Sequence, residues 1–269
     1  NFLLFDYKGE FSDIQNNHWL ALFDVDRSCI LDPLTQPLPF TPFKDFTGRS
    51  INEINLYSTE MSSALCSIDR VSASANMNNR LSEAIVEAYK STNGAPISFE
   101  LMLKCYQSRM KDANNDDSIS SVLKQLVNAH IFESEDKVSL IDDSYIIKMD
   151  GYPKDGPIAK AIVYFLMSKL NNIYELLDKQ AVNDEVVQIR HFSIIDEAHY
   201  MLDFDNRPLR NLIAVGRNKG LSIILATQNM SSFKSKGFDF YANAQYPLIM
   251  KQQTIDDKVI KDLFGVSGQ

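Results

Sequence analysis

The sequence predicts an α/β protein with a mainly parallel sheet, helices on both faces of that sheet, and an all-helical insertion. One observation is that short apolar runs, such as FLLFD at residues 2–6, alternate along the chain with helical or polar segments. Strands buried on both faces are continuously apolar, and this alternation is typical of a parallel sheet covered by helices. The other observation is a change of period between Ile51 and about Phe132, where apolar residues recur at helical spacing.

The expected strands share a short apolar body bounded by polar or turn-forming residues. They are Phe2 to Asp6, one or two strands within Leu22 to Leu31, Tyr145 to Met149, His191 to Asp196, Leu221 to Thr227 and Tyr246 to Lys251. The first run ends at the turn-prone sequence KGE, and a cluster of prolines between residues 33 and 42 interrupts regular structure before the helical stretch.

The helical stretch divides the chain into residues 1–48 and 136–269, which form the core, and residues 49–135, which form the insertion. Within the insertion, Leu81 and Ile85 begin one helical repeat, and the turn-forming segment TNGAP separates two of the helices. After the insertion, a long helix is expected from Pro157 to about Leu177.

Composition limits the class of protein. Of the 269 residues, 45% are apolar and 23% are charged, which is ordinary globular usage. No apolar run approaches the roughly 18 residues that span a bilayer, so we expect a cytoplasmic protein without membrane contact. The formal charge of −8 argues against a surface coated in basic residues, so DNA contacts would occupy a small part of it. Cys29, Cys66 and Cys105 lack disulfide or zinc-ligand spacing, which predicts buried thiols.

The string FSIIDEAH, at residues 192–199, is the most informative for chemistry. Its apolar strand ends in two adjacent carboxylates, Asp196 and Glu197. Nucleotide hydrolysis needs one carboxylate on the side of the metal ion and another that faces the attacking water, and adjacent acids at a strand end can fill these roles. The alternative is that the acid pair only caps a following helix, whose amino end favours negative charge.

A second informative stretch, GRNKGLSIILATQN, joins a basic turn to a strand that is followed by Gln228. A polar side chain at the tip of the strand beside the acid pair can hydrogen-bond the terminal phosphate or its attacking water, and Gln228 is that candidate. The alternative is an amide that satisfies loop backbone. Arg217, in the turn, could stabilise charge on the transferred phosphoryl group, and an ordinary surface arginine is the competing interpretation.

Candidate DNA contacts are Lys234 and Lys236, which lie in the polar, glycine-containing stretch SSFKSKGF. Such a loop could face a central pore and touch phosphates without reading sequence. A solvated surface loop is the alternative. His199, although next to the acid pair, is expected to be an ordinary helix residue.

In order and approximate spacing, the DYKGEF segment at residues 6–11, the IIDEAH strand, the GRNKG turn and the ILATQN strand resemble the HerA/FtsK superfamily. This superfamily includes HerA-like helicases and the ATPases of type IV secretion. The resemblance covers most of the chain and implies a RecA-like core of the ASCE P-loop NTPase class, ATP and Mg²⁺ as cofactors, and a homo-hexameric ring with active sites between subunits. By the resemblance, each candidate has a role: Asp196 helps to hold the metal ion, Glu197 polarises the water, Gln228 senses the phosphate, and Arg217 reaches a neighbouring subunit's nucleotide.

The function implied is that of an ATP-driven motor, a translocase or helicase of HerA type acting on double-stranded DNA. Within the superfamily the chain is most similar to motors of bacterial DNA defence or processing, of the DptH type in phosphorothioation-dependent restriction, which implies a nuclease or another defence protein as partner. The first alternative is a type IV secretion-like ATPase that moves protein or nucleoprotein. The second is a non-catalytic assembly module of the same fold.

One departure from the family pattern concerns the phosphate-binding loop. No G-x-x-x-x-G-K-[ST] sequence occurs in the 269 residues, although this loop normally wraps the nucleotide phosphates. In the family it lies one strand and one helix before the DYKGEF strand, so we expect a fragment that begins after it and that is inactive as an ATPase on its own. A degenerate homologue is the alternative, although it would have no reason to keep the carboxylates of Asp196 and Glu197, which form the Walker B motif of the family.

Overall fold

The structure is a computed structural model that describes residues 1–13, 15, 25, 27–68, 73–112, 115–183, 186–202, 204–228, 234–235, 238–244, 246–248, 250 and 261. Its main sheet is built from β1 (Phe2–Asp6), β2 (Ile30–Leu31), β3 (Tyr145–Lys148), β6 (His191–Ile195) and β7 (Leu221–Leu225). Each of these strands lies within a run that the sequence predicts as a strand. Much of the predicted strand region before Ile30 lies outside the described residues.

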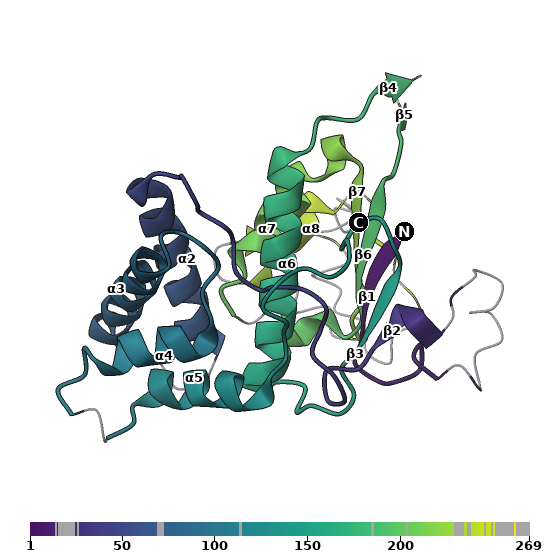
Figure 1. Ribbon diagram of the computed structural model, residues 1–269. Coiled ribbons are helices and arrows are strands. Elements are labelled where there is room, and N and C mark those ends of the chain that lie inside the picture. Colours follow the sequence, from purple (N-terminus) through teal and green to yellow (C-terminus); the bar gives the residue numbers. More distant parts are fainter. Residues whose placement is uncertain are drawn as a thin grey trace.

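In the described part of the chain these strands form a five-stranded sheet in the order β2-β3-β1-β6-β7. Every pairing in it is parallel; Leu4, for example, pairs with Ile146 of β3 and with Ile194 of β6. The carboxyl ends of these strands therefore lie together at one edge, called the carboxyl edge below (Figure 1). Open parallel sheets bind their ligands beyond this edge.

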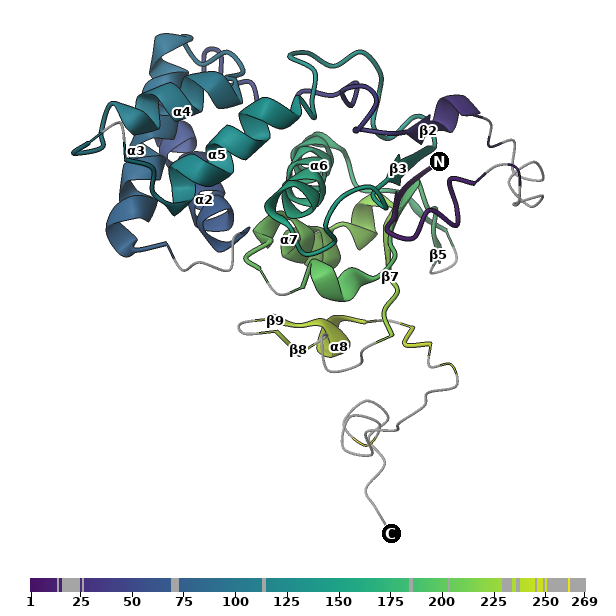
Figure 2. The ribbon, with the colours of Figure 1, turned by 90° about the horizontal axis from the view of Figure 1, so that it is seen from below.

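Two core helices, α6 (Pro157–Leu176) and α7 (Arg207–Val215), lie on the same side of the sheet (Figures 1 and 2). Because successive strand residues face opposite sides, Leu3 and Phe5 belong to the main hydrophobic core with these helices. Leu4 and Ile146 face the other way and form a smaller cluster with Val25. The helices predicted on both faces are thus seen on one face in the described residues, and Val25 packs against the other face.

The central helix of the molecule is α6. It begins after Gly156 with Pro157 in its first turn, where a missing backbone N–H leaves no hydrogen bond unmade. Most of its residues are buried, which follows from its place between the sheet and the helical insertion (Figure 1). Among the helices of the described residues, α6 included, none combines the length and the hydropathy needed to cross a membrane.

The helical insertion shares its core with the sheet. It contains the helices α2 (Ile51–Ile68), α3 (Ala75–Ser91), α4 (Phe99–Gln107) and α5 (Ser118–Ala129), all between β2 and β3 in the chain. Phe165 of α6 is fully buried, and its ring lies 5.3 to 5.9 Å from the rings of Phe43, Phe99 and Phe132. Such aromatic contacts join the insertion to α6, so one continuous core extends from the sheet into the insertion. The predicted helices are confirmed, and the boundaries at residues 48 and 135 stay predictions.

The last part of the chain departs from the sequence prediction. A buried strand was expected from Tyr246 to Lys251, but Tyr246, Leu248 and Met250 are 86%, 87% and 81% exposed and lie in no strand. An apolar run becomes a strand only where a neighbouring strand supplies backbone partners, and β7 pairs only with β6 in the described residues. The segments before this run are β8 (Lys234–Ser235), β9 (Phe238–Asp239) and α8 (Phe240–Asn243).

Candidate functional site

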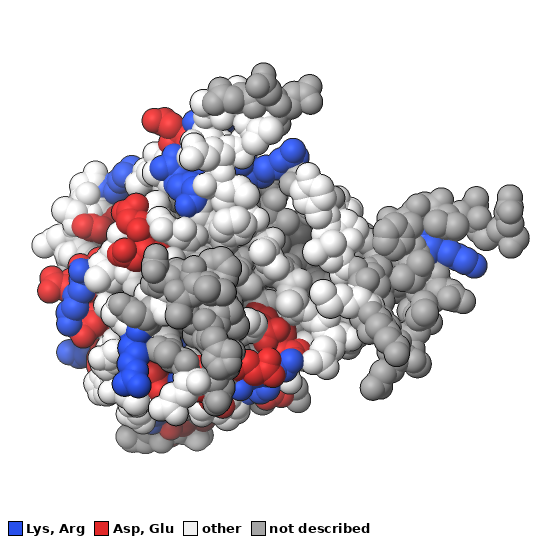
Figure 3. Space-filling model, turned by 90° about the vertical axis from the view of Figure 1, so that its right-hand side faces the viewer, with Lys and Arg blue, Asp and Glu red and all other residues white. Residues whose placement is uncertain are grey.

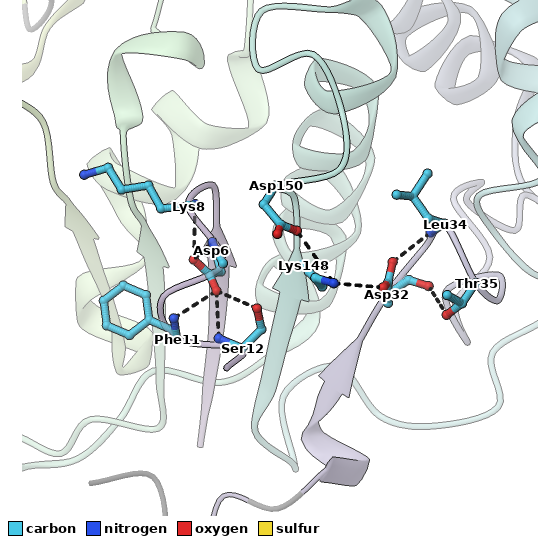
Figure 4. Close-up of polar contacts among 10 residues, drawn as sticks. Asp6, Lys8, Phe11, Ser12, Asp32, Leu34, Thr35, Lys148 and Asp150 are labelled. Atoms are coloured by element: carbon cyan, nitrogen blue, oxygen red, sulfur yellow. Dashed lines mark hydrogen bonds and ion pairs between the residues drawn. The ribbon is translucent and has the colours of Figure 1, made fainter. Parts of the chain in front are cut away.

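Charged residues gather at the carboxyl edge of the sheet. Asp6 ends β1, Lys148 ends β3, and Asp196 follows β6. Figure 4 shows the ends of β1, β2 and β3 beside one another, with Lys148 Nζ 3.4 Å from Oδ2 of Asp32. The acid pair predicted from the sequence therefore lies in a charged setting built by several strands.

The turn after β1 is held by Asp6, which is fully buried. Its two carboxylate oxygens accept hydrogen bonds of 2.8 to 3.3 Å from the backbone N–H groups of Lys8, Gly9, Phe11 and Ser12 (Figure 4). Gly9 has a φ of +74°, and a Cβ at this position would lie 2.7 Å from Oδ2 of Asp150. Glycine is therefore required where this turn meets the turn after β3, and the backbone that carries Lys8 is fixed.

Several side chains converge on Glu197, which directly follows Asp196. Glu197 is 5% exposed, and its backbone has a φ of 50° and a ψ of 42°, a left-handed conformation that is uncommon outside glycine and recurs at functional sites. Oε1 of Glu197 lies 2.6 Å from Nζ of Lys8 and accepts a hydrogen bond of 3.1 Å from Nε2 of Gln228. Oε2 lies 3.3 Å from Nδ1 of His199. Groups from the turn after β1 and from the end of β7 thus meet at one carboxylate.

This geometry contradicts the interpretation of Glu197 as a helix cap. The segment after β6 is a single turn of 3₁₀ helix, η2 (Ala198–Tyr200), and the Glu197 side chain makes no capping hydrogen bond to it. The carboxylate instead contacts Lys8 in the turn after β1 and Gln228 in the segment after β7. Its position therefore suits a chemical role better than a capping role.

Asp196 is partly buried beside Glu197. Burial raises the pKa of its carboxyl above the ordinary value, against the opposing effects of the Glu197 backbone N–H and the Lys8 charge. In nucleotide sites Mg²⁺ is held by one or two carboxylates together with phosphate oxygens and water. Asp196 fits that requirement as one carboxylate, and the described residues contain no group of three or more side chains that could hold a metal ion by themselves.

Arg217 lies at the opposite edge of the sheet. It begins the 3₁₀ helix η3 (Arg217–Lys219), is exposed, and precedes β7, whereas Gln228 follows that strand. The five residues of β7 span roughly 16 Å. Arg217 is therefore too far from Glu197 to share a site with it inside one subunit, and its role across a subunit interface stays a prediction.

The candidate DNA contacts are only partly described. Lys234 lies in β8, which pairs antiparallel with β9, and Lys236 lies outside the described residues. On the face in Figure 3, Lys and Arg side chains are interspersed with Asp and Glu. This mixture agrees with the inference, from the net charge of −8, that basic residues do not coat the surface.

Sequence reasoning missed Lys8 and His199 as members of the site. Lys8 lies in the DYKGEF segment, but its contact with Glu197 depends on β1 and β6 being neighbours, which the segment does not reveal. His199 was expected to be an ordinary helix residue, yet its Nδ1 also lies 3.2 Å from Oγ1 of Thr227. Its position two residues after Glu197 was the available signal.

The parallel sheet and its flanking helices define an α/β protein with a RecA-like fold. The fold is similar to that of VirB4 of Thermoanaerobacter pseudethanolicus, with a TM-score of 0.65 and 15% identity over 99% of this chain and 73% of that chain. The plasmid coupling protein TrwB in complex with ADP and Mg²⁺ gives a lower TM-score of 0.46, with 13% identity over 90% of this chain and 66% of that chain. Comparisons with protein-family models and with curated proteins give no match.

Proposed function

We propose that this chain carries the ATPase core of a motor of HerA type, which hydrolyses ATP with Mg²⁺ to move double-stranded DNA. The observation that carries the proposal is the contact between Glu197 and Gln228. These residues are 31 positions apart in the chain, yet Nε2 of Gln228 donates a 3.1 Å hydrogen bond to Oε1 of Glu197 at the carboxyl edge. A carboxylate beside a polar amide, at the ends of adjacent parallel strands, matches the base and the sensor that nucleotide hydrolysis requires.

In this function each side chain has a distinct role. Asp196 would help to hold Mg²⁺, which would neutralise charge on the phosphates. Glu197 takes a proton from the attacking water, and Gln228 hydrogen-bonds the terminal phosphate or that water. Arg217, exposed at the edge of the sheet opposite the carboxyl edge, completes the site of a neighbouring subunit in a homo-hexameric ring. Because these 269 residues contain no phosphate-binding loop sequence, the loop is proposed to lie outside them.

The DNA-related part of the proposal rests on fewer residues. Lys234 and Lys236 are proposed to touch DNA phosphates, which suits a motor that does not read sequence. A cytoplasmic location, a place in bacterial DNA defence and a nuclease partner belong to the same proposal.

A second candidate is an ATPase of the type IV secretion kind, which moves protein or nucleoprotein. The similarity in fold to VirB4, with a TM-score of 0.65, favours it. The two candidates share the site and differ in cargo, so the effect of DNA on turnover separates them. Turnover stimulated by double-stranded DNA supports the DNA motor, and turnover indifferent to DNA supports the secretion-type ATPase.

The test of the proposed function is the Glu197→Gln substitution in the full-length protein. It should lower ATP turnover about a hundredfold or more while ATP binding persists, because it removes a general base and keeps the shape of the side chain. Glu83→Gln is the matched control, since Glu83 lies on α3 of the insertion with a side chain that is 71% exposed. Normal turnover by Glu197→Gln would refute the assigned base, and a wild-type protein without turnover would favour a non-catalytic assembly module.

A further inference from the structure

Lys8 makes a close ion pair with the candidate base. Its Nζ lies 2.6 Å from Oε1 of Glu197, and the two side chains are 29% and 7% exposed, respectively. Burying a carboxylate is costly unless it is paired, and the partner of Glu197 lies in the turn after β1. The hydrogen bond to Glu197 raises the pKa of Lys8 above its ordinary value, so the ammonium is charged at neutral pH.

The same contact occupies the oxygen that a base would use. A general base must come within about 2.6 to 3.2 Å of the group whose proton it takes. Oε1 of Glu197 already has Nζ of Lys8 and Nε2 of Gln228 within this range, and Oε2 faces Nδ1 of His199 at 3.3 Å. Oε1 therefore already has two donors, and one of them must leave before this oxygen can activate water.

Lys8 is suited to be the donor that leaves. Its backbone is held by Asp6, so its point of attachment does not need to move. Its side chain is partly exposed on a flexible four-carbon stem, and an ammonium binds phosphate as a compact point charge. Figure 4 shows this side chain directed away from Lys148 and Asp32, which form their own ion pair at 3.4 Å.

We propose that Lys8 binds the terminal phosphate of a nucleoside triphosphate and thereby controls access of water to Glu197. Without that phosphate, Lys8 holds the Glu197 carboxylate. When a triphosphate is bound, the Lys8 ammonium moves to its terminal phosphate and leaves Oε1 of Glu197 accessible to water. This inference rests on the proposed function and adds that Lys8 distinguishes ATP from ADP at the same site.

The test measures affinity instead of turnover. Calorimetry with Mg²⁺ gives the affinity of a non-hydrolysable ATP analogue and of ADP for the full-length wild type, Lys8→Met, Glu197→Gln and the double variant. Lys8→Met should weaken binding of the analogue about tenfold and leave ADP unchanged, because one charged hydrogen bond to phosphate is lost. Glu197→Gln should strengthen binding of the analogue several-fold, because it releases Lys8, and should have no such effect in the Lys8→Met background. Lys124→Met, at a control lysine on α5 whose ion pair with Asp116 lies away from the sheet, should leave both affinities unchanged.

The possible results separate this inference from the proposed function. Equal binding of the analogue by wild type and Lys8→Met overturns the inference, as does a Glu197→Gln effect of the same size with and without Lys8. If the wild type binds neither nucleotide, the proposed function fails and the inference fails with it. If Lys8→Met does not fold because it leaves Glu197 without a countercharge, the double variant replaces it. The double variant should bind the analogue at least tenfold more weakly than Glu197→Gln alone, and equal affinities overturn the inference.

Discussion

The buried side chain of His191 should make the stability of this fold depend on pH. Its imidazole is fully buried at the start of β6, and neither ring nitrogen has a hydrogen-bond partner in the described part of the chain. Burial lowers the pKa of His191 from 6.5 to about 4, because the charged form is poorly solvated there. Between these values the unfolded chain binds a proton that the native state does not bind. Stability is therefore lost as the pH falls below 6.5, and the loss is complete below about pH 4.

The size of this effect follows from the two pKa values. They are separated by about 2.5 pH units, and at about 1.4 kcal/mol per unit the loss amounts to about 3 kcal/mol. His191→Phe removes the titrating group and keeps an aromatic ring of similar size. Between pH 7 and pH 4, the free energy of unfolding should therefore fall by about 3 kcal/mol less in His191→Phe than in the wild type.

Urea denaturation at a series of pH values between 7 and 4 measures the effect. The matched control is His130→Asn, since His130 is an exposed residue at the end of α5 whose left-handed backbone asparagine tolerates. The control should keep the acid sensitivity of the wild type. If His191→Phe keeps it too, the buried imidazole does not cause the acid sensitivity and the reasoning is refuted.

Further predictions concern the subunit interface, DNA and the core. Arg217→Ala should lower turnover about a thousandfold and spare nucleotide binding. Rings mixed from Arg217→Ala and Glu197→Gln subunits should regain part of the activity, and mixed rings that form but stay inactive would contradict a role across the interface. Replacing Lys234 and Lys236 by Ala should weaken DNA binding equally for all sequences and reduce the slope of log affinity against log salt by about 2, whereas a sequence-selective loss would contradict phosphate contacts. Phe165→Ala should lower the free energy of unfolding in urea by about 3 to 5 kcal/mol, and a loss below about 1 kcal/mol would show that the insertion and the sheet do not share a core.

The strands and helices of this fold follow from local patterns in the sequence. The apolar runs that became β1, β3, β6 and β7 and the helical periods of α2 to α5 are local properties, because each depends on residues a few positions apart. Local sequence also placed Asp196 and Glu197 at one strand end and Gln228 just beyond another. Their meeting at the carboxyl edge follows once the strands are parallel neighbours, and the 3.1 Å contact between Gln228 and Glu197 agrees with that expectation.

Local patterns do not specify which distant elements become neighbours; the packing of the folded chain does. Lys8 meets Glu197 because β1 pairs with β6, although the two strands are far apart in the sequence. The exposure of Tyr246 and Leu248 has the same kind of cause, since an apolar run is buried only where a sheet edge receives it. Arg217 lies apart from Glu197 because its turn precedes a parallel strand whose other end carries Gln228. These relations depend on pairing between distant segments, so no local period or motif contains them.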